Sequence, residues 1–270
     1  RLAAEMGADY IESDLVVSKD RHLIIRHDRY LSTSTDVADH PEFRERRVVK
    51  EGREESDWFI EDFTLEEIKT LKARQSYSGR STKFDGQFEI PTFDEVLALG
   101  CALSDELGRT VGVYPETKHP SFFKAIGLDH VPLLLSALDR YGHTGTDAPI
   151  YVQSFEPAIL RELRHRTAVK LVHLLPAIND DMPMEEVATF ADAIGPYKNI
   201  LAQSEAGANS GLINQAHALG LEVHPWTFRN DALPENFPTP EAEIAFFIHL
   251  GIDGIFSDFP DTVAATLKRA

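Results

Sequence analysis

The chain has 270 residues, 43% of them hydrophobic, which is enough to build one sizeable core. Its 44 acidic residues outnumber its 27 basic residues, and the formal net charge of −17 argues against binding to nucleic acid or to an anionic membrane. The single cysteine, Cys101, excludes an internal disulfide and a cysteine-rich metal site, and no apolar run has the length of a membrane span.

The first residues, RLAAEMG, have the pattern of a helix that ends at Gly7. Strand-like runs and helical segments then alternate along the chain, which predicts a parallel sheet with helices outside it. The expected strands are ADYIESDLVV, HLIIRH, TVGVYPET, PIYVQS, VKLVHLL, ADAIGP, LEVHPWT and DGIFSD. The expected helices cover 64–74, 92–103, 121–140, 156–166, 184–192, 208–219, 239–250 and 260–269; the first two open with the capping-box pairs Thr64/Glu67 and Thr92/Glu95.

The first two strands are joined by only KDR, which is too short for a parallel crossover. They are therefore expected to form an antiparallel hairpin. With a two-residue loop of Asp20 and Arg21, His27 would lie opposite Asp14 on the same face of the hairpin. A slip of one residue would turn His27 to the other face.

Residues 36–90 are highly charged and lack strand periodicity, so we interpret them as an insertion, for the most part a solvated charged excursion over one end of the domain. No linker divides the chain, which indicates a single domain over residues 1–270. Without HLIIRH there are seven alternating strands, one fewer than a closed (β/α)8 barrel needs. Because the helix at residue 1 also lacks a preceding strand, we expect the first barrel strand and the true N-terminus to be missing from the sequence.

Acidic residues occur where barrel strands carry their functional groups. Glu12 and Asp14 are two residues apart in an apolar strand and therefore share a face, and Glu116 with Lys118 follows another apolar strand. Three carboxylates without cysteine or other soft ligands favour a hard cation, Ca²⁺ or Mg²⁺. The alternative for Glu12 and Asp14 is pairing with lysine or arginine, and on those two residues alone the alternatives are even.

Several other polar or aromatic residues also follow strands. Gln153 and Trp226 are candidate substrate contacts, Trp226 as a wall of the pocket, and Lys118 is a candidate anion contact. His173 is interpreted as a core residue, and Asp258 as either a helix cap or a site residue. His27 is a candidate general acid or base beside a metal, and metal, lysine and histidine together suit cleavage of a phosphate ester.

The segment GADYIESDLVVSKDRHLIIRHD resembles the glycerophosphodiester phosphodiesterase family, and YPETKHP, QSFE, HPWTFRN and DGIFSDFPD resemble its later motifs in the same order. The resemblance extends from about Glu5 to Thr262. It implies a (β/α)8 TIM barrel with an insertion after the first hairpin. It also implies Ca²⁺- or Mg²⁺-dependent hydrolysis of a small glycerophosphodiester to sn-glycerol 3-phosphate and an alcohol.

By the same resemblance, Glu12, Asp14 and Glu116 match the metal ligands, His27 matches one of two catalytic histidines, and Lys118 matches a phosphate contact. The family's opening His-Arg-Gly motif, which carries the other histidine and a phosphate-binding arginine, is absent. The form of VYPETKHP and the long insertion look most like the exported bacterial branch. That implies a periplasmic or secreted protein whose signal peptide belongs to the missing N-terminus.

Three alternatives stay open at this point. A related barrel phospholipase D of the spider-venom type typically carries disulfides, which the single cysteine argues against. A sugar- or inositol-phosphate lyase would use the same metal site with a different alcohol pocket. A non-catalytic binding barrel would keep the metal site and turn nothing over.

Overall fold

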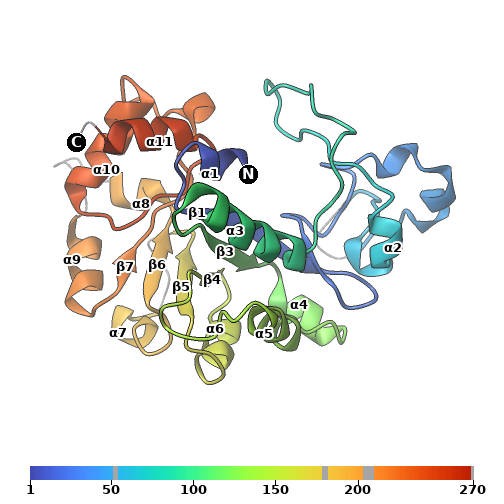
Figure 1. Ribbon diagram of the computed structural model, residues 1–270, viewed down its shortest axis with the longest axis horizontal. Helices are drawn as coiled ribbons and strands as arrows, with labels where there is room; N and C mark the ends of the chain where they lie inside the picture. Colours follow the sequence, from blue (N-terminus) through green and yellow to red (C-terminus); the bar gives the residue numbers. More distant parts are fainter. Residues whose placement is uncertain (51–53, 178–181, 203–209, 269–270) are drawn as a thin grey trace. The chain divides into compact units, whose positions relative to one another are not determined.

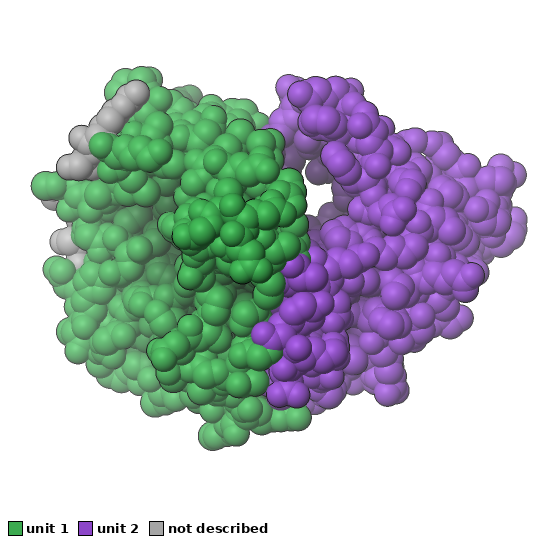
Figure 2. Space-filling view, in the orientation of Figure 1, with its two compact units in different colours: residues 1–12, 99–114, 142–270 green, residues 13–98, 115–141 purple. Residues whose placement is uncertain are grey.

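The structure, a computed structural model, describes residues 1–50, 54–177, 182–202 and 210–268. The chain divides into two compact units, which Figure 2 distinguishes by colour. Unit 1 comprises residues 1–12, 99–114 and 142–270, and unit 2 comprises residues 13–98 and 115–141. Within the described ranges, every helix is too short or too polar to cross a bilayer.

Among the described residues, seven strands form one sheet in the order β2-β1-β3-β4-β5-β6-β7. Strands β4 to β7 pair in parallel, whereas β1 and β2 are antiparallel, as the short KDR connection predicts. The α/β architecture with a mostly parallel sheet is thus confirmed. The strands are β1 (Tyr10–Val17), β2 (Leu23–Ile25), β3 (Gly112–Thr117), β4 (Tyr151–Ser154), β5 (Lys170–Leu175), β6 (Ala193–Pro196) and β7 (Glu222–Val223).

The parallel strands are nearly continuous runs of buried residues, as expected for strands covered on both faces. In unit 1, α6 packs against β4 and β5, and α9 packs against β7 (Figure 1). The α-helices in the part of the chain that the structure describes are α1 (Leu2–Glu5), α2 (Leu65–Ile68), α3 (Phe93–Leu107), α4 (Pro120–Ala125), α5 (His130–Arg140), α6 (Pro157–Arg164), α7 (Met184–Val187), α8 (Lys198–Ala202), α9 (Ser210–Ala218), α10 (Pro240–Leu250) and α11 (Pro260–Leu267).

The helix boundaries follow local capping chemistry. In α10, the Thr239 side chain accepts a hydrogen bond from the Ala242 amide, and the helix ends at Gly251 with a φ of +91°. The predicted capping boxes are both present, because Thr64 and Glu67, and likewise Thr92 and Glu95, exchange reciprocal hydrogen bonds.

Unit 1 contains a buried salt bridge between Lys198 and Glu243. The Lys198 ammonium, at the start of α8, lies 2.7 Å from Oε1 of Glu243 in α10, and both side chains are at least 95% buried. The ammonium also lies 5.0 Å from the ring centre of Phe228. This pair links two helices whose nearest ends, Ala202 and Pro240, are 38 positions apart in sequence.

Some elements differ from the sequence-based expectations. The expected strand DGIFSD forms only a single parallel bridge, Phe228 with Ser257. The expected helix at 121–140 is two helices, because the chain turns at Gly127, with φ +81°, and Asp129 caps a new helix by accepting from the Val131 amide. The expected helix at 184–192 keeps only its first turn as α7, and residues 208–209 of another lie outside the described ranges.

The insertion at 36–90 lies within unit 2; many of its described residues are exposed, as expected for a solvated excursion, but another part of it packs around buried residues. Its described residues have an aromatic core, with Phe43, Phe59 and Phe63 at most 5% exposed. Trp58 is also buried and its indole nitrogen donates to the Phe43 carbonyl at 2.6 Å. The charged residues therefore surround a small core of packed aromatic side chains. Residues 51–53 of the insertion lie outside the described ranges.

The hairpin loop has three residues, one more than the two-residue alternative. The Ser18 amide donates to the His22 carbonyl, and Arg21 adopts a left-handed conformation with φ +67°. Leu15 consequently pairs with Ile25, so Arg26 lies opposite Asp14 and its amide donates to the Asp14 carbonyl. His27 follows just beyond this last pair rather than opposite Asp14.

Candidate active site

The carboxylates predicted to bind a metal come together on β1 and β3. Glu12, Asp14 and Glu116 each offer an oxygen, and these oxygens all lie within 4.8 Å of one another. Alternation along β1 puts Glu12 and Asp14 on one face, which explains how two acids of the same strand reach one point. Three hard oxygen ligands on rigid strands form a donor set suited to Ca²⁺ or Mg²⁺.

Lys118, the residue after β3, is in direct contact with two of these acids. Its ammonium lies 2.8 Å from Oε1 of Glu116 and 3.2 Å from Oδ1 of Asp14, and its side chain is 11% exposed. Burial lowers the pKa of Lys118, but the charges of Asp14 and Glu116 outweigh burial and leave the pKa above its ordinary value. Lys118 therefore stays protonated, a fixed positive charge beside the carboxylates.

Glu116 is the most deeply buried of the three carboxylates. Burial raises the pKa of Glu116 to about 7, with repulsion from Asp14 acting in the same direction and the charge of Lys118 opposing both. A carboxylate in this environment gains most from a nearby positive charge. The donor set thus fits a divalent cation both by ligand type and by charge.

His27 lies at the surface, with its side chain 71% exposed and Nδ1 2.8 Å from Oδ1 of Asp28. That hydrogen bond raises the pKa of His27, while burial and the charge of Lys118 lower it and the charges of Asp14 and Asp28 raise it. The net pKa is above the ordinary histidine value. An exposed imidazole oriented by a carboxylate and close to a lysine and an aspartate is suited to proton transfer.

Gln153, at the end of β4, is 2% exposed and donates from Nε2 to Oε1 of Glu12 at 3.0 Å. A buried amide that donates to a ligand carboxylate fixes the direction in which that ligand points. Gln153 thus has a contact that orients Glu12, in addition to the substrate contact predicted for it.

The last residues considered from the sequence are Trp226, His173 and Asp258. Trp226 is half-buried; its indole nitrogen donates to the Gly195 carbonyl at 2.7 Å and its ring packs on Tyr197. His173 is 1% exposed, as expected for a core residue. Asp258 lies 3.4 Å from Arg229, and the cap of α11 is Phe259 instead.

Several residues with roles near the site were not predicted from the sequence. His130, at the start of α5, is fully buried and its Nε2 donates to the carbonyl of Leu15 at 3.1 Å. The same carbonyl accepts the Lys118 amide at 3.0 Å. Only the helical pattern around His130 was visible in the sequence, because its partner is a backbone atom 115 positions away.

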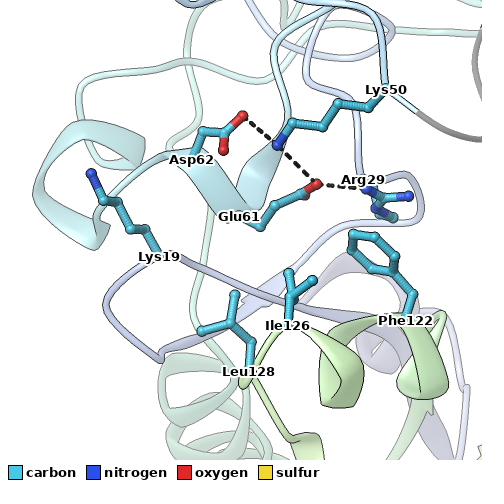
Figure 3. Close-up of a pocket in the computed structure, with 8 residues that line it drawn as sticks. All are labelled: Lys19, Arg29, Lys50, Glu61, Asp62, Phe122, Ile126 and Leu128. Atoms are coloured by element: carbon cyan, nitrogen blue, oxygen red, sulfur yellow. Dashed lines mark hydrogen bonds and ion pairs between the residues drawn. The ribbon is translucent and has the colours of Figure 1, made fainter.

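A second unpredicted cluster surrounds Arg29, two residues after His27 (Figure 3). Its guanidinium lies 3.3 Å from the ring centre of Phe122 and donates to Oε1 of Glu61 at 2.6 Å. Lys50 pairs with Glu61 as well, at 3.3 Å, and with Asp62 at 2.6 Å. The cluster lines a pocket of about 550 Å³ inside unit 2, with Ile126 and Leu128 on its apolar side.

Comparison with known proteins agrees with the chemistry of the site. The chain is 33% identical over 292 aligned residues to a glycerophosphodiester phosphodiesterase of Arabidopsis thaliana, covering 95% of this chain and 77% of the relative. It is 31% identical to the glycerophosphodiester phosphodiesterase of Haemophilus influenzae, covering 99% of this chain and 84% of the relative.

Solved structures share the fold. A crystal structure of a putative glycerophosphoryl diester phosphodiesterase from Silicibacter pomeroyi has a TM-score of 0.72 at 19% identity, covering 99% of this chain and 85% of that one. A phosphodiesterase of Oleispira antarctica, in complex with the product sn-glycerol-3-phosphate, has a TM-score of 0.67 at 18% identity, covering 99% and 88%. The expected fold of the TIM-barrel type is thereby confirmed. The sequence profile of one family matches residues 1–262, and the chain belongs to that family of enzymes, the glycerophosphoryl diester phosphodiesterases.

Proposed function

We propose that the chain hydrolyses glycerophosphodiesters to sn-glycerol 3-phosphate and an alcohol, with a divalent metal held by Glu12, Asp14 and Glu116. The observation that carries the proposal is the convergence of the three carboxylates around one point, with the Lys118 ammonium beside two of them. Family membership and the product bound to the Oleispira antarctica relative support the substrate class. When bound, Ca²⁺ or Mg²⁺ would supply positive charge to the phosphoryl oxygens.

The residues of the chain divide the remaining tasks. In this proposal, Lys118 binds a phosphoryl oxygen and offsets the charge that develops there. His27 moves a proton through Nε2, because its Nδ1 is hydrogen-bonded to Asp28. Gln153 holds the Glu12 carboxylate through its buried amide. Trp226 is proposed to contact the alcohol portion of the substrate.

The deciding experiment measures release of glycerol 3-phosphate from glycerophosphocholine and from glycerophosphoethanolamine. We expect turnover to be abolished by a chelator, to return with Ca²⁺ or Mg²⁺, and to be lost in E12Q and H27A. Gln at position 12 keeps the shape of the side chain and removes the ligand charge. Turnover that survives the chelator and E12Q would contradict the proposed metal site.

The alternatives make different predictions in the same assay. A lyase would accumulate a cyclic phosphate that is not opened to glycerol 3-phosphate. A non-catalytic barrel would bind the metal and show no turnover at all. A phospholipase D of the related type would prefer a lipid substrate over the water-soluble diesters.

We also propose that the protein is exported, on the basis of the form of VYPETKHP and of the insertion at 36–90. Fractionation of cells that express the natural gene tests this proposal. Recovery of the protein from the cytosolic fraction alone would contradict it.

A further inference from the structure

Arg29 is linked to the segment that carries His27. The segment from Arg29 to Ser32 runs beside residues 57–60 of the insertion: the Ile60 amide donates to the Arg29 carbonyl at 2.8 Å, and the Leu31 amide donates to the Trp58 carbonyl at 2.8 Å. Tyr30 and Phe59 form an antiparallel bridge between the same two segments. The backbone that follows His27 is therefore bound to the insertion.

The Arg29 side chain adds a charged contact to this backbone pairing. It is 11% exposed, and it donates to Oε1 of Glu61, whose side chain is 4% exposed. Lys50 contacts the same carboxylate oxygen, so two cations share one buried acid. Removing one partner of such a buried ion pair lowers the stability of the fold, because the other partner stays desolvated and unpaired.

The guanidinium also contacts α4. Its central carbon lies 3.3 Å from the ring centre of Phe122, close enough for a strong cation–π contact (Figure 3). Helix α4 begins at Pro120, two residues after Lys118. The guanidinium thus lies between an acid of the insertion and a ring close to Lys118 in sequence.

We propose that Arg29 is a positioning residue for phosphodiester hydrolysis. Its guanidinium fastens the segment after His27 to Glu61 on one side and to Phe122 on the other, which holds the imidazole at a fixed separation from Lys118. The proposal rests on the proposed role of His27 in proton transfer.

In this proposal the insertion positions His27 through Glu61 and Arg29, and it does so without contacting the substrate. His27 is exposed, so few side chains pack around it to limit its motion. Displacements near 1 Å in a reacting group cost up to about 100-fold in rate. A rigid attachment two residues away is a means of limiting such displacements.

The experiment compares variants of Arg29 with matched variants of Arg46. Arg46 makes the same kind of cluster elsewhere in the insertion: its Nη2 lies 2.5 Å from Oε1 of Glu67, and its guanidinium lies 5.0 Å from the Phe63 ring centre. Its contacts among the described residues are to Glu67, Phe43 and Phe63, all of them outside the segment that carries His27. R46M therefore removes an ion pair of the same type, at a more exposed position (37% exposed at Arg46 against 11% at Arg29), without loosening that segment.

We expect R29M to lower kcat by 10- to 100-fold with a change in KM of less than about threefold and with unchanged metal affinity. R29K, which keeps the charge but not the fork geometry, should recover part of the loss. R46M should leave kcat within about twofold of the original protein. The His27 Hε1 NMR resonance should shift or broaden in R29M and stay unchanged in R46M.

If R29M does not fold, E61Q gives the same comparison, because it removes the charge on the partner of Arg29 and keeps its volume. Kinetic parameters of R29M or E61Q that match those of R46M would overturn the proposal. A parallel loss of kcat and metal affinity would also overturn it, since it would indicate general damage to the site. Activity retained in H27A would instead refute the role of His27 itself, so the two failures are distinguishable.

Discussion

The ammonium of Lys118 lies 2.8 Å from Oε1 of Glu116 and 3.2 Å from Oδ1 of Asp14, so two carboxylates of the predicted metal triad are paired with a cation of the protein. The sequence left two alternatives for the acids, a metal or an ion pair with lysine. In the structure, the ion pair is present for Asp14 and Glu116, and its lysine is the same residue that the family resemblance gives as a phosphate contact.

Substitution of Lys118 should therefore affect metal binding and turnover in opposite directions. K118M removes a positive charge from two ligands, and we expect divalent metal to bind several-fold more tightly. Turnover should fall by at least 100-fold, because the phosphoryl group loses its counter-charge. Calorimetric metal titration and the glycerol 3-phosphate assay measure the two effects. K124M, an exposed lysine paired with Asp129, is the control and should change neither value.

Substitution of Gln153 tests whether its hydrogen bond orients Glu12. Q153L removes the buried donor, and we expect metal affinity to fall by about 10- to 100-fold while the fold is retained. Titration with Ca²⁺, followed by the rise in Tm, measures this change. The matched control is Q87L, whose amide donates to a carbonyl in an exposed loop. Equal metal affinity in the two variants would show that Glu12 does not depend on Gln153.

His130 should make the protein less stable in mild acid. Burial lowers the pKa of His130 from 6.5 to about 4, so the unfolded chain binds a proton more readily than the folded chain. The stability due to neutral His130 is complete above pH 6.5 and is lost as the pH falls from 6.5 to 4. The full loss amounts to roughly 3 kcal/mol.

Urea denaturation at several pH values measures this effect. H130Q does not titrate, so the difference in unfolding free energy between it and the original protein should shrink as the pH falls towards 4. A difference that stays constant between pH 7 and pH 4 would contradict the assignment.

The buried pair of Lys198 and Glu243 gives a prediction about stability alone. E243Q leaves a buried ammonium without its counter-charge, and we expect the free energy of unfolding to fall by about 3–5 kcal/mol. The double variant K198M/E243L replaces both charges with apolar side chains and should recover most of that loss. Denaturant unfolding of the two variants side by side measures the difference, and an equal loss in both would indicate that packing, not charge, dominates.

The parts of this protein that could be predicted from the sequence are those set by local periodicity. Alternation placed Glu12 and Asp14 on one face, and the short connection before His22 required an antiparallel hairpin. The hairpin register was not determined, because KDR is compatible with a two-residue as well as a three-residue loop. The observed three-residue loop places Arg26, and not His27, opposite Asp14.

Contacts between distant segments could not be predicted in the same way. Arg29 and Glu61 are 32 positions apart within a stretch rich in charge, and nothing in the pattern distinguishes this pair from the exposed charges around it. The core of the insertion was missed for a similar reason. Its aromatic residues are spaced irregularly, and neither helix nor strand periodicity marks them as buried.

The contacts of the Arg29 guanidinium with Glu61 and Phe122 also have an evolutionary consequence. Replacement of either Arg29 or Glu61 alone would leave the other as an unpaired buried charge. Positions 29 and 61 should therefore change together among relatives that carry the insertion. Phe122 should accept only residues with a flat face, whereas the exposed charges of the insertion are free to vary. Descendants that lose the insertion would have to anchor the histidine segment by other means.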